Sequence, residues 1–240
     1  MDWLDRYEIR ARMAPAVIIS IPLVISIISI ASIFSGKFTQ WIIGGGFVLA
    51  AFGYMLSFLI RYYGRELENE LWSDWDGAPS TRFMRWRDLT LGDDLKKQLH
   101  EAVKSYCKIR LSSKDQEKEN PGRADEQIKL AFLQVKGMVR QNDPDGIWVK
   151  HNAEYGFHRN LLGSRSLWLA SAIISIIACG IAFELTKNDI LILGATLNIF
   201  FAIISILGGW HYLPKIIRNT ADRYAESIWI SFLTGLKRKT

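Results

Sequence analysis

The sequence predicts an all-α membrane protein in which four transmembrane helices form two hairpins and a helical cytoplasmic domain is inserted between them. The first observation is that the apolar residues gather into four long runs that contain no charged residue. About 20 apolar residues are enough to cross a bilayer as a helix. The second observation is that the segment between the second and third runs is rich in charge and places its apolar residues at helical spacing.

The four runs cover residues 13–36, 38–60, 166–183 and 190–214. Lys37 alone separates the first two runs, and residues 184–189 separate the last two. Short links join antiparallel neighbours, so residues 13–60 and 166–214 are expected to form the two transmembrane hairpins. The other segments are then an N-terminal helix (1–12), the inserted domain (61–165) and a C-terminal amphipathic helix (215–240).

The distribution of basic residues predicts the orientation. The two links hold one lysine each, Lys37 and Lys187, whereas the other 28 of the 30 Lys and Arg residues lie on the opposite side. Cytoplasmic loops of membrane proteins carry an excess of Lys and Arg. We therefore expect both termini and residues 61–165 to lie in the cytoplasm.

The inserted domain is expected to consist of helices. Residues 61–72 continue the second run, and Thr90 and Asp93 have the spacing of a capping box that opens a helix. The polar tract 112–122 contains Pro-Gly and is expected to be a mobile loop. Two further helices are predicted over 124–141 and 147–162. The inward face of the first of these holds Ile128, Phe132, Val135 and Val139.

The motif content argues against an enzyme and against a metal site. The four histidines are scattered, and the two cysteines, Cys107 and Cys179, do not have metal-ligand spacing. The sequence contains no nucleophile motif, no phosphate-binding loop and no pair of catalytic carboxylates near a histidine. We therefore predict no catalytic residue, no metal and no cofactor.

Strongly polar side chains are rare in the apolar runs, which bears on transport. None of the runs contains Asp, Glu, Lys or Arg, so a proton relay of the kind used by coupled transporters is not expected. A weakly polar pore could form in an oligomer, or the same side chains could hydrogen-bond to the backbone and to neighbouring helices. The side chains in question are Ser26, Ser29, Asn198 and Ser205.

Two stretches of the inserted domain combine aromatic and basic residues. The tryptophan–arginine stretch (residues 71–88) holds three of the nine tryptophans and three closely spaced arginines; the aromatic–basic stretch (residues 152–165) directly precedes the third run. Together they could form one pocket in which arginines contact phosphates and aromatic rings stack on bases. The alternatives are that they stabilise the domain or form an aromatic–basic belt at the membrane. The predicted ligand-binding residues are Trp72, Trp75, Arg82, Arg85, Trp86, Arg87, Tyr155, Phe157, His158, Arg159 and Asn160.

The same stretches resemble those of a family of bacterial four-span membrane proteins. LWSDWDGAPSTRFMRWRD (71–88) is similar to the family form LW..WGG.PTT..LRHRD, and YGFHRNLLG (155–163) to YGFRRNLLG. RYEIRARMAP (6–15), which leads into the first run, also fits, so the resemblance covers most of the chain. This sequence departs from the family form at Asp76, Ser80, Trp86 and His158. At His158 it lacks the permanent charge of an arginine, which weakens a phosphate role for that position.

In layout the chain also resembles the membrane effectors of the Hailong anti-phage defence system. That resemblance implies an oligomeric ion channel of the bacterial inner membrane, for instance a tetramer. It further implies that a partner nucleotidyltransferase makes single-stranded DNA oligomers, which bind the effector and hold it inactive until infection releases them and the membrane depolarises. A hypothesis from another class stays open, namely a non-conducting membrane scaffold or sensor whose cytoplasmic domain binds a protein partner.

Overall fold

The computed structural model describes the backbone of residues 6–33 and 38–237, and the side chains of residues 7–33 and 51–235. These residues form helices and turns, and no strand occurs among them, which confirms the predicted all-α class. The link at Lys37 and the last residues of the basic C-terminus lie outside the described part. The chain divides into two compact units. Unit 1 comprises Met1–Glu68 and Ala153–Ile217, and unit 2 comprises Asn69–Asn152 and Arg218–Thr240.

Three helices are long and apolar enough to cross a membrane, which confirms the membrane character of the chain. They cover Ile9–Ala31, Arg165–Thr186 and Ile190–Gly235. The second predicted span, residues 38–60, lies in the continuous helix α3 (Phe38–Asp74), but the side chains of residues 38–50 lie outside the described part. A fourth span and the hairpin arrangement therefore stay predictions.

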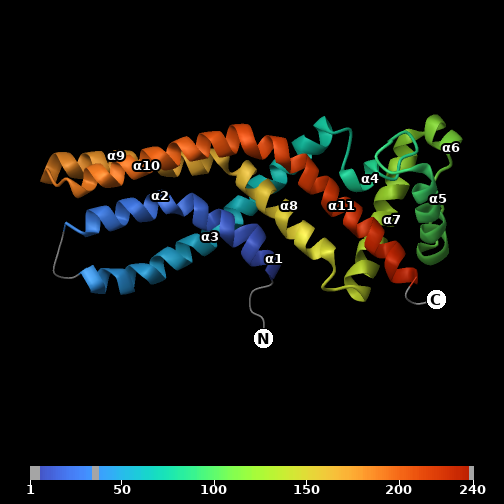
Figure 1. Cartoon of the computed structure of the whole chain (residues 1–240), viewed down its shortest axis with the longest axis horizontal. Coiled ribbons are helices and arrows are strands. Elements are labelled where there is room, and N and C mark those ends of the chain that lie inside the picture. Colours follow the sequence, from blue (N-terminus) through green and yellow to red (C-terminus); the bar gives the residue numbers. More distant parts are fainter. Residues whose placement is uncertain (1–5, 34–37, 238–240) are drawn as a thin grey trace. The chain divides into compact units, whose positions relative to one another are not determined.

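The centre of unit 1 is a bundle of three apolar helices. Helix α2 (Ala14–Ala31) packs against α9 (Arg165–Thr186) and α10 (Ile190–Ile206), and α9 and α10 run side by side (Figure 1). Small residues permit this close packing, because a Cβ atom added at Gly194 would lie only 2.5 Å from the Ser29 Oγ. Close contact between helix backbones is a main source of stability where lipid surrounds the helices.

Polar side chains link the three helices of this bundle. The Ser26 Oγ donates to the Ser175 carbonyl (3.2 Å) and accepts from the Asn198 Nδ2 (3.0 Å). Ser29 and Ser205 are buried as well. The four residues predicted as candidates for a pore lining therefore lie in the interior of a single chain, where they contribute to helix packing. A pore formed between copies of the chain stays a prediction.

Unit 2 has its own apolar core. Its elements are the last turn of α3, α4 (Pro79–Arg82), α5 (Asp93–Ala102), the π-helix η2 (Val103–Cys107), α6 (Lys114–Glu119), α7 (Pro121–Asn142), the start of α8 (Ile147–Gly163), and α11 (Leu213–Lys237) from Arg218 onward. Helix α7 buries Ile128, Val135 and Val139 and packs Phe132 against the same core, which confirms the predicted face. Helix α11 adds Ile228, Trp229 and Phe232.

Two local predictions for unit 2 are wrong. Helix α5 is preceded by Gly92 without a side-chain cap, because Thr90 belongs to a turn in which its N–H donates to the Asp88 carboxylate (2.8 Å). The tract 112–122 forms α6 and the first turn of α7 instead of a mobile loop. Reciprocal hydrogen bonds between Ser113 and Gln116 satisfy amides at the start of α6, so a helix with little apolar surface can form there.

Candidate ligand site

The tryptophan–arginine stretch begins at the end of α3 and reverses direction through a tight turn. Asp76 (φ 58°) and Gly77 (φ 109°) both have left-handed backbone conformations, and the second is one that side chains rarely adopt. Pro79 then occupies the first turn of α4, where its missing N–H costs nothing. This turn directs the side chains of the following residues into unit 2.

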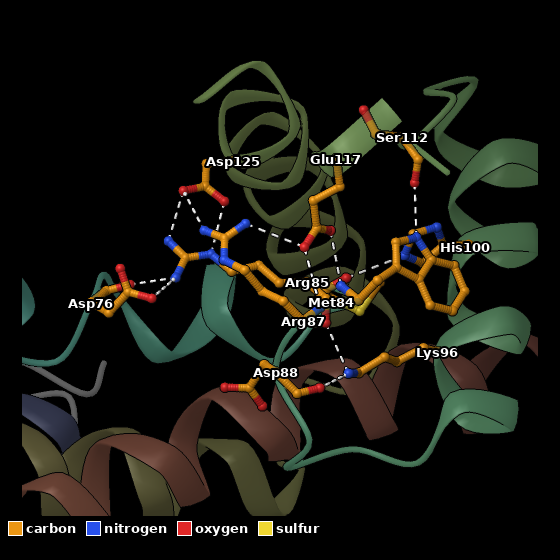
Figure 2. Close-up of polar contacts among 11 residues, drawn as sticks. Asp76, Met84, Arg85, Arg87, Asp88, Lys96, His100, Ser112, Glu117 and Asp125 are labelled. Atoms are coloured by element: carbon orange, nitrogen blue, oxygen red, sulfur yellow. Dashed lines mark hydrogen bonds and ion pairs between the residues drawn. The ribbon is translucent and has the colours of Figure 1, made fainter. Parts of the chain in front are cut away.

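Arg85 is buried in a cluster of carboxylates (Figure 2). Its Nε and Nη2 donate to the two oxygens of Asp125 at 2.8 and 2.7 Å. Its Nη1 donates to the Asp76 carboxylate (2.9 Å) and to the carbonyl of the same residue. Two-point pairing of this kind fixes the geometry as well as the charge. The protein itself therefore occupies the donors of Arg85.

Arg82 is also buried and lies between two carboxylates. Its Nη2 is 2.9 Å from an Asp222 oxygen on α11, and its Nε is 3.2 Å from Asp88. Burial raises the pKa of Asp222 above its ordinary value, and the nearby Arg82 opposes this shift. Arg82 thereby links the tryptophan–arginine stretch to the C-terminal helix.

Arg87 differs from the other two arginines because 41% of its side chain is exposed. It pairs with Glu117 at 3.2 Å and lies 3.7 Å from Asp125. Buried Glu117 also accepts hydrogen bonds from the backbone N–H groups of Trp86 (2.9 Å) and Arg87 (3.2 Å). Because Glu117 lies on α6, these bonds attach the backbone of Trp86 and Arg87 to that helix. Of the three arginines, Arg87 is the one that an external anion could reach.

The three tryptophans of the stretch are half-buried. The Trp86 Nε1 donates to the Ser112 carbonyl (2.9 Å), and the Trp86 ring lies 4.6 Å from the His100 ring and 5.4 Å from the Lys114 Nζ. Burial lowers the pKa of His100, which favours the neutral ring. Trp72 and Trp75 lie before the turn, at and just beyond the end of α3.

Lys96 organises the backbone beneath the three arginines. Its side chain is fully buried, and its Nζ donates to the carbonyls of Arg85 (2.8 Å) and Asp88 (Figure 2). Burial lowers the pKa of Lys96, while Asp88 acts in the opposite direction. An ammonium group has three N–H donors, so one lysine can donate hydrogen bonds to several carbonyls of the same turn.

The aromatic–basic stretch lies on α8 and packs within unit 1. The Arg159 Nη1 donates to Glu68 (3.1 Å), which also accepts from the Tyr155 hydroxyl (2.8 Å). The Asn160 side chain is fully buried and donates to the Ala11 carbonyl (2.6 Å) in the π-helix η1 (Ile9–Met13). Phe157 and His158 are half-buried neighbours whose rings lie 5.4 Å apart.

Close backbone approach explains the glycines beside this network. A Cβ atom at Gly163 would lie 2.6 Å from the Tyr63 carbonyl of α3, and one at Gly156 would lie 2.8 Å from the Ala11 Cβ. A Cβ atom at Gly64 would collide with the Asn160 side chain. Glycine at these positions lets η1, α3 and α8 cross in direct contact.

The predicted site residues thus fall into two groups, residues 72–87 in unit 2 and residues 155–160 in unit 1. The single pocket that would join them stays a prediction. Sequence reasoning missed the acidic partners and the buried lysine that organise both groups. The capping box at Ser113 and Gln116 was a signal for α6, and therefore for Glu117, whereas no sequence feature pointed to the others. The missed residues are Glu68, Lys96, Glu117, Asp125 and Asp222.

Comparison of the chain with family models, with curated proteins and with solved structures gives no match. Among the residues that the structure describes, no group of three His, Cys, Asp or Glu side chains is placed to hold a metal ion.

Proposed function

We propose that the chain is a membrane effector in which unit 2 receives a signal and the apolar helices of unit 1 act on the bilayer. In its specific form, the proposed effector is an oligomeric ion channel of the bacterial inner membrane. A single-stranded DNA oligomer or related nucleotide, bound to the cytoplasmic domain, holds it inactive, and release depolarises the membrane. A partner nucleotidyltransferase supplies the oligomer, as the resemblance to Hailong effectors implies.

One observation carries this proposal. The apolar helix that begins at Ile190 continues without a break to Gly235, through α10, the π-helix η3 (Leu207–Tyr212) and α11. In unit 2 the same helix supplies Asp222 to Arg82, and the Trp229 Nε1 to the Ser80 carbonyl (3.1 Å). A ligand that alters the tryptophan–arginine stretch therefore acts on residues in the same helix as an apolar membrane segment.

The energy that such a switch requires is within reach of a short oligomer. Shifting a two-state equilibrium from 1:99 to 99:1 requires about 5.5 kcal/mol of differential binding. Base stacking on an aromatic ring contributes roughly 1–3 kcal/mol per base, and phosphate contacts add to it. Arg87, Trp86 and Lys114 provide one exposed cation, one ring and a second cation close to that ring.

The test is ion flux from liposomes that contain the full chain, with and without short single-stranded DNA. The proposal expects flux in the absence of the oligomer and suppression in its presence, with oligomer binding that weakens as salt rises. Absence of flux under every condition would refute the channel. Flux that does not respond to DNA would refute the gating.

Arg87→Gln is the variant that the geometry selects for this assay, because Arg82 and Arg85 are held inside the fold. It should weaken DNA binding. It should also make the plot of log K against log salt concentration less steep by about 0.7, the value for one phosphate contact to single-stranded DNA. Lys129→Gln, which removes another exposed cation of unit 2 on α7, is the control and should change neither. Equal effects of the two variants would exclude a specific role for Arg87.

A second candidate function is a non-conducting scaffold or sensor that binds a protein partner. Two exposed leucines favour it, because Leu130 (52% exposed) and Leu133 (67% exposed) lie one turn apart on α7. Contiguous exposed apolar surface marks protein-binding sites, and these two side chains would form part of such a surface. This alternative predicts no current in the liposome assay, whatever oligonucleotide is added.

A further inference from the structure

The helix crossing in unit 1 gathers arginines from three elements. Gly64 of α3, Asn160 of α8 and Ala11 of η1 meet at this crossing. Each of these contact residues has an arginine within three positions along the chain. Besides the exposed Arg10, these arginines are Arg12, Arg61, Arg65 and Arg159, and Arg12, Arg65 and Arg159 lie close enough to Arg61 for their charges to act on it. Four guanidinium groups therefore lie around a single crossing.

The carboxylates at this crossing neutralise only part of its charge. Arg12 pairs with Glu8 (2.6 Å) and Arg159 with Glu68 (3.1 Å). Glu66 is exposed and accepts from the Tyr62 hydroxyl (2.5 Å). Arg61 is half-buried, and among the described residues it makes no hydrogen bond or ion pair.

The surroundings of Arg61 are electropositive. Burial lowers the pKa of its guanidinium, and the positive charges of Arg12, Arg65 and Arg159 lower it further. The group nevertheless stays charged at any physiological pH, because arginine does not lose its proton in proteins. A half-buried cation among like charges is a position that an external anion would stabilise.

An apolar groove begins next to this cluster. Its volume is about 710 Å³, and its walls come from α2 and from the Phe52–Tyr54 segment of α3. The groove is also lined by Met13, the last residue of η1, which directly follows Arg12. On α3, Tyr54 precedes Arg61 by seven residues, about 10 Å along the helix. A groove with an apolar lining and cations at one end matches an amphiphile with an anionic head.

We infer that unit 1 binds an anionic phospholipid, with its phosphate at Arg61 and Arg12 and an acyl chain in the groove between α2 and α3. The cations lie just beyond the ends of the apolar runs, where a lipid head group would be. The groove lies within the runs, where the acyl chains would be. Each basic residue at a membrane surface contributes about 1 kcal/mol to the free energy of binding to anionic lipid. A guanidinium can donate two parallel hydrogen bonds to a phosphate, which distinguishes this pairing from general attraction to the surface.

The test of the head group uses the delipidated full chain in a neutral detergent. Thermal stability and native mass spectrometry would be measured with phosphatidylglycerol and with phosphatidylcholine of the same acyl chains. We expect phosphatidylglycerol to bind more tightly, and Arg61→Gln to weaken its binding about five- to tenfold. Lys215→Gln removes an exposed cation of the same unit and should leave binding unchanged. Equal binding of the two lipids, or equal effects of the two variants, would overturn the inference.

The test of the groove uses two glycines with open space around them. Apart from the nearby backbone of its own helix, no described atom lies within 4 Å of a Cβ added at Gly53, which lines the groove, or at Gly180, which lies on α9 and does not line it. Gly53→Leu should reduce phosphatidylglycerol binding, whereas Gly180→Leu should not. Circular dichroism and gel filtration would establish that the variants are folded.

Two soluble ligands distinguish a lipid from other sources of phosphate. Glycerol 3-phosphate has the anionic head without the chains, and it should bind far more weakly than the lipid. Equal affinity would overturn the role of the groove. A short single-stranded DNA that displaces phosphatidylglycerol and loses affinity in Arg61→Gln would overturn the lipid assignment in favour of a nucleic-acid site.

Discussion

Replacement of Arg85 by alanine tests whether the tryptophan–arginine stretch stabilises the fold. Removing one member of a buried ion pair costs about 3–5 kcal/mol, because the other charge is left without its partner. In the variant, Asp76 would be hydrated, because its side chain is 81% exposed. Asp125 would still have a cation nearby, because Arg87 lies 3.7 Å from it. We therefore expect the lower end of this range, a loss of about 3 kcal/mol in the free energy of unfolding.

The matched control is Arg87→Ala. Its side chain is 41% exposed, so its pair with Glu117 should contribute no more than about 1 kcal/mol. Urea unfolding of the full chain in detergent micelles, followed by tryptophan fluorescence, measures both values. The double variant Arg85→Ala/Asp125→Ala should lose clearly less stability than the sum of the losses of the two single variants. Each single variant already removes the Arg85–Asp125 ion pair, so the sum counts the loss of this pair twice.

Two results would refute this reasoning. One is a loss for Arg85→Ala no larger than that for Arg87→Ala. The other is additivity in the double variant. If Arg85→Ala left stability unchanged but abolished oligonucleotide binding, Arg85 would be a ligand contact and the ion pairs would be incidental to its role.

Three further predictions concern glycines and a histidine. Gly163→Ala should destabilise the protein strongly, because its Cβ would meet the α3 backbone at 2.6 Å; Gly137→Ala on open α7 surface should stabilise it by roughly 0.5–1 kcal/mol in the same unfolding assay. Gly194→Val should disrupt the apolar bundle and lower the melting temperature, whereas Gly180→Val, with open space around it, should have little effect. The pKa of His100 is lowered in the fold, so its contribution to stability is complete above the ordinary value of about 6.5 and declines as pH falls toward the lowered value. Urea midpoints should therefore fall between pH 7 and pH 5.5 more for the native chain than for His100→Gln.

The sequence predicts those parts of the fold that depend on hydrophobic periodicity. The buried face of α7 and the three long apolar helices follow from spacing and run length, because burial of apolar surface determines where those residues lie. Helix α6 could not be predicted in this way. It has little apolar surface, and it is defined by hydrogen bonds at its first turn.

The candidate site was less predictable, since its chemistry depends on long-range pairing. The composition of residues 71–88 shows arginines beside aromatic rings, a combination that suits both phosphate binding and a structural cluster. The acidic partners of the three arginines that lie outside the stretch are 30 to 140 residues away along the chain, at Glu117, Asp125 and Asp222. Only the fold reveals that all three arginines pair with carboxylates and that Arg82 and Arg85 are also buried.

The long C-terminal helix has a consequence for the order of biosynthesis. Ala225, Ile228, Trp229 and Phe232 belong to the core of unit 2, although the rest of that core comes from residues 83–148. The ribosome must therefore synthesise both of the apolar runs 166–183 and 190–214 before this core can close. Residues 69–152 therefore stay an incompletely packed domain while the ribosome synthesises the two apolar runs that follow them. Loss of the segment from residue 225 onward would leave that domain with an exposed apolar face and make it a target for chaperones and proteases.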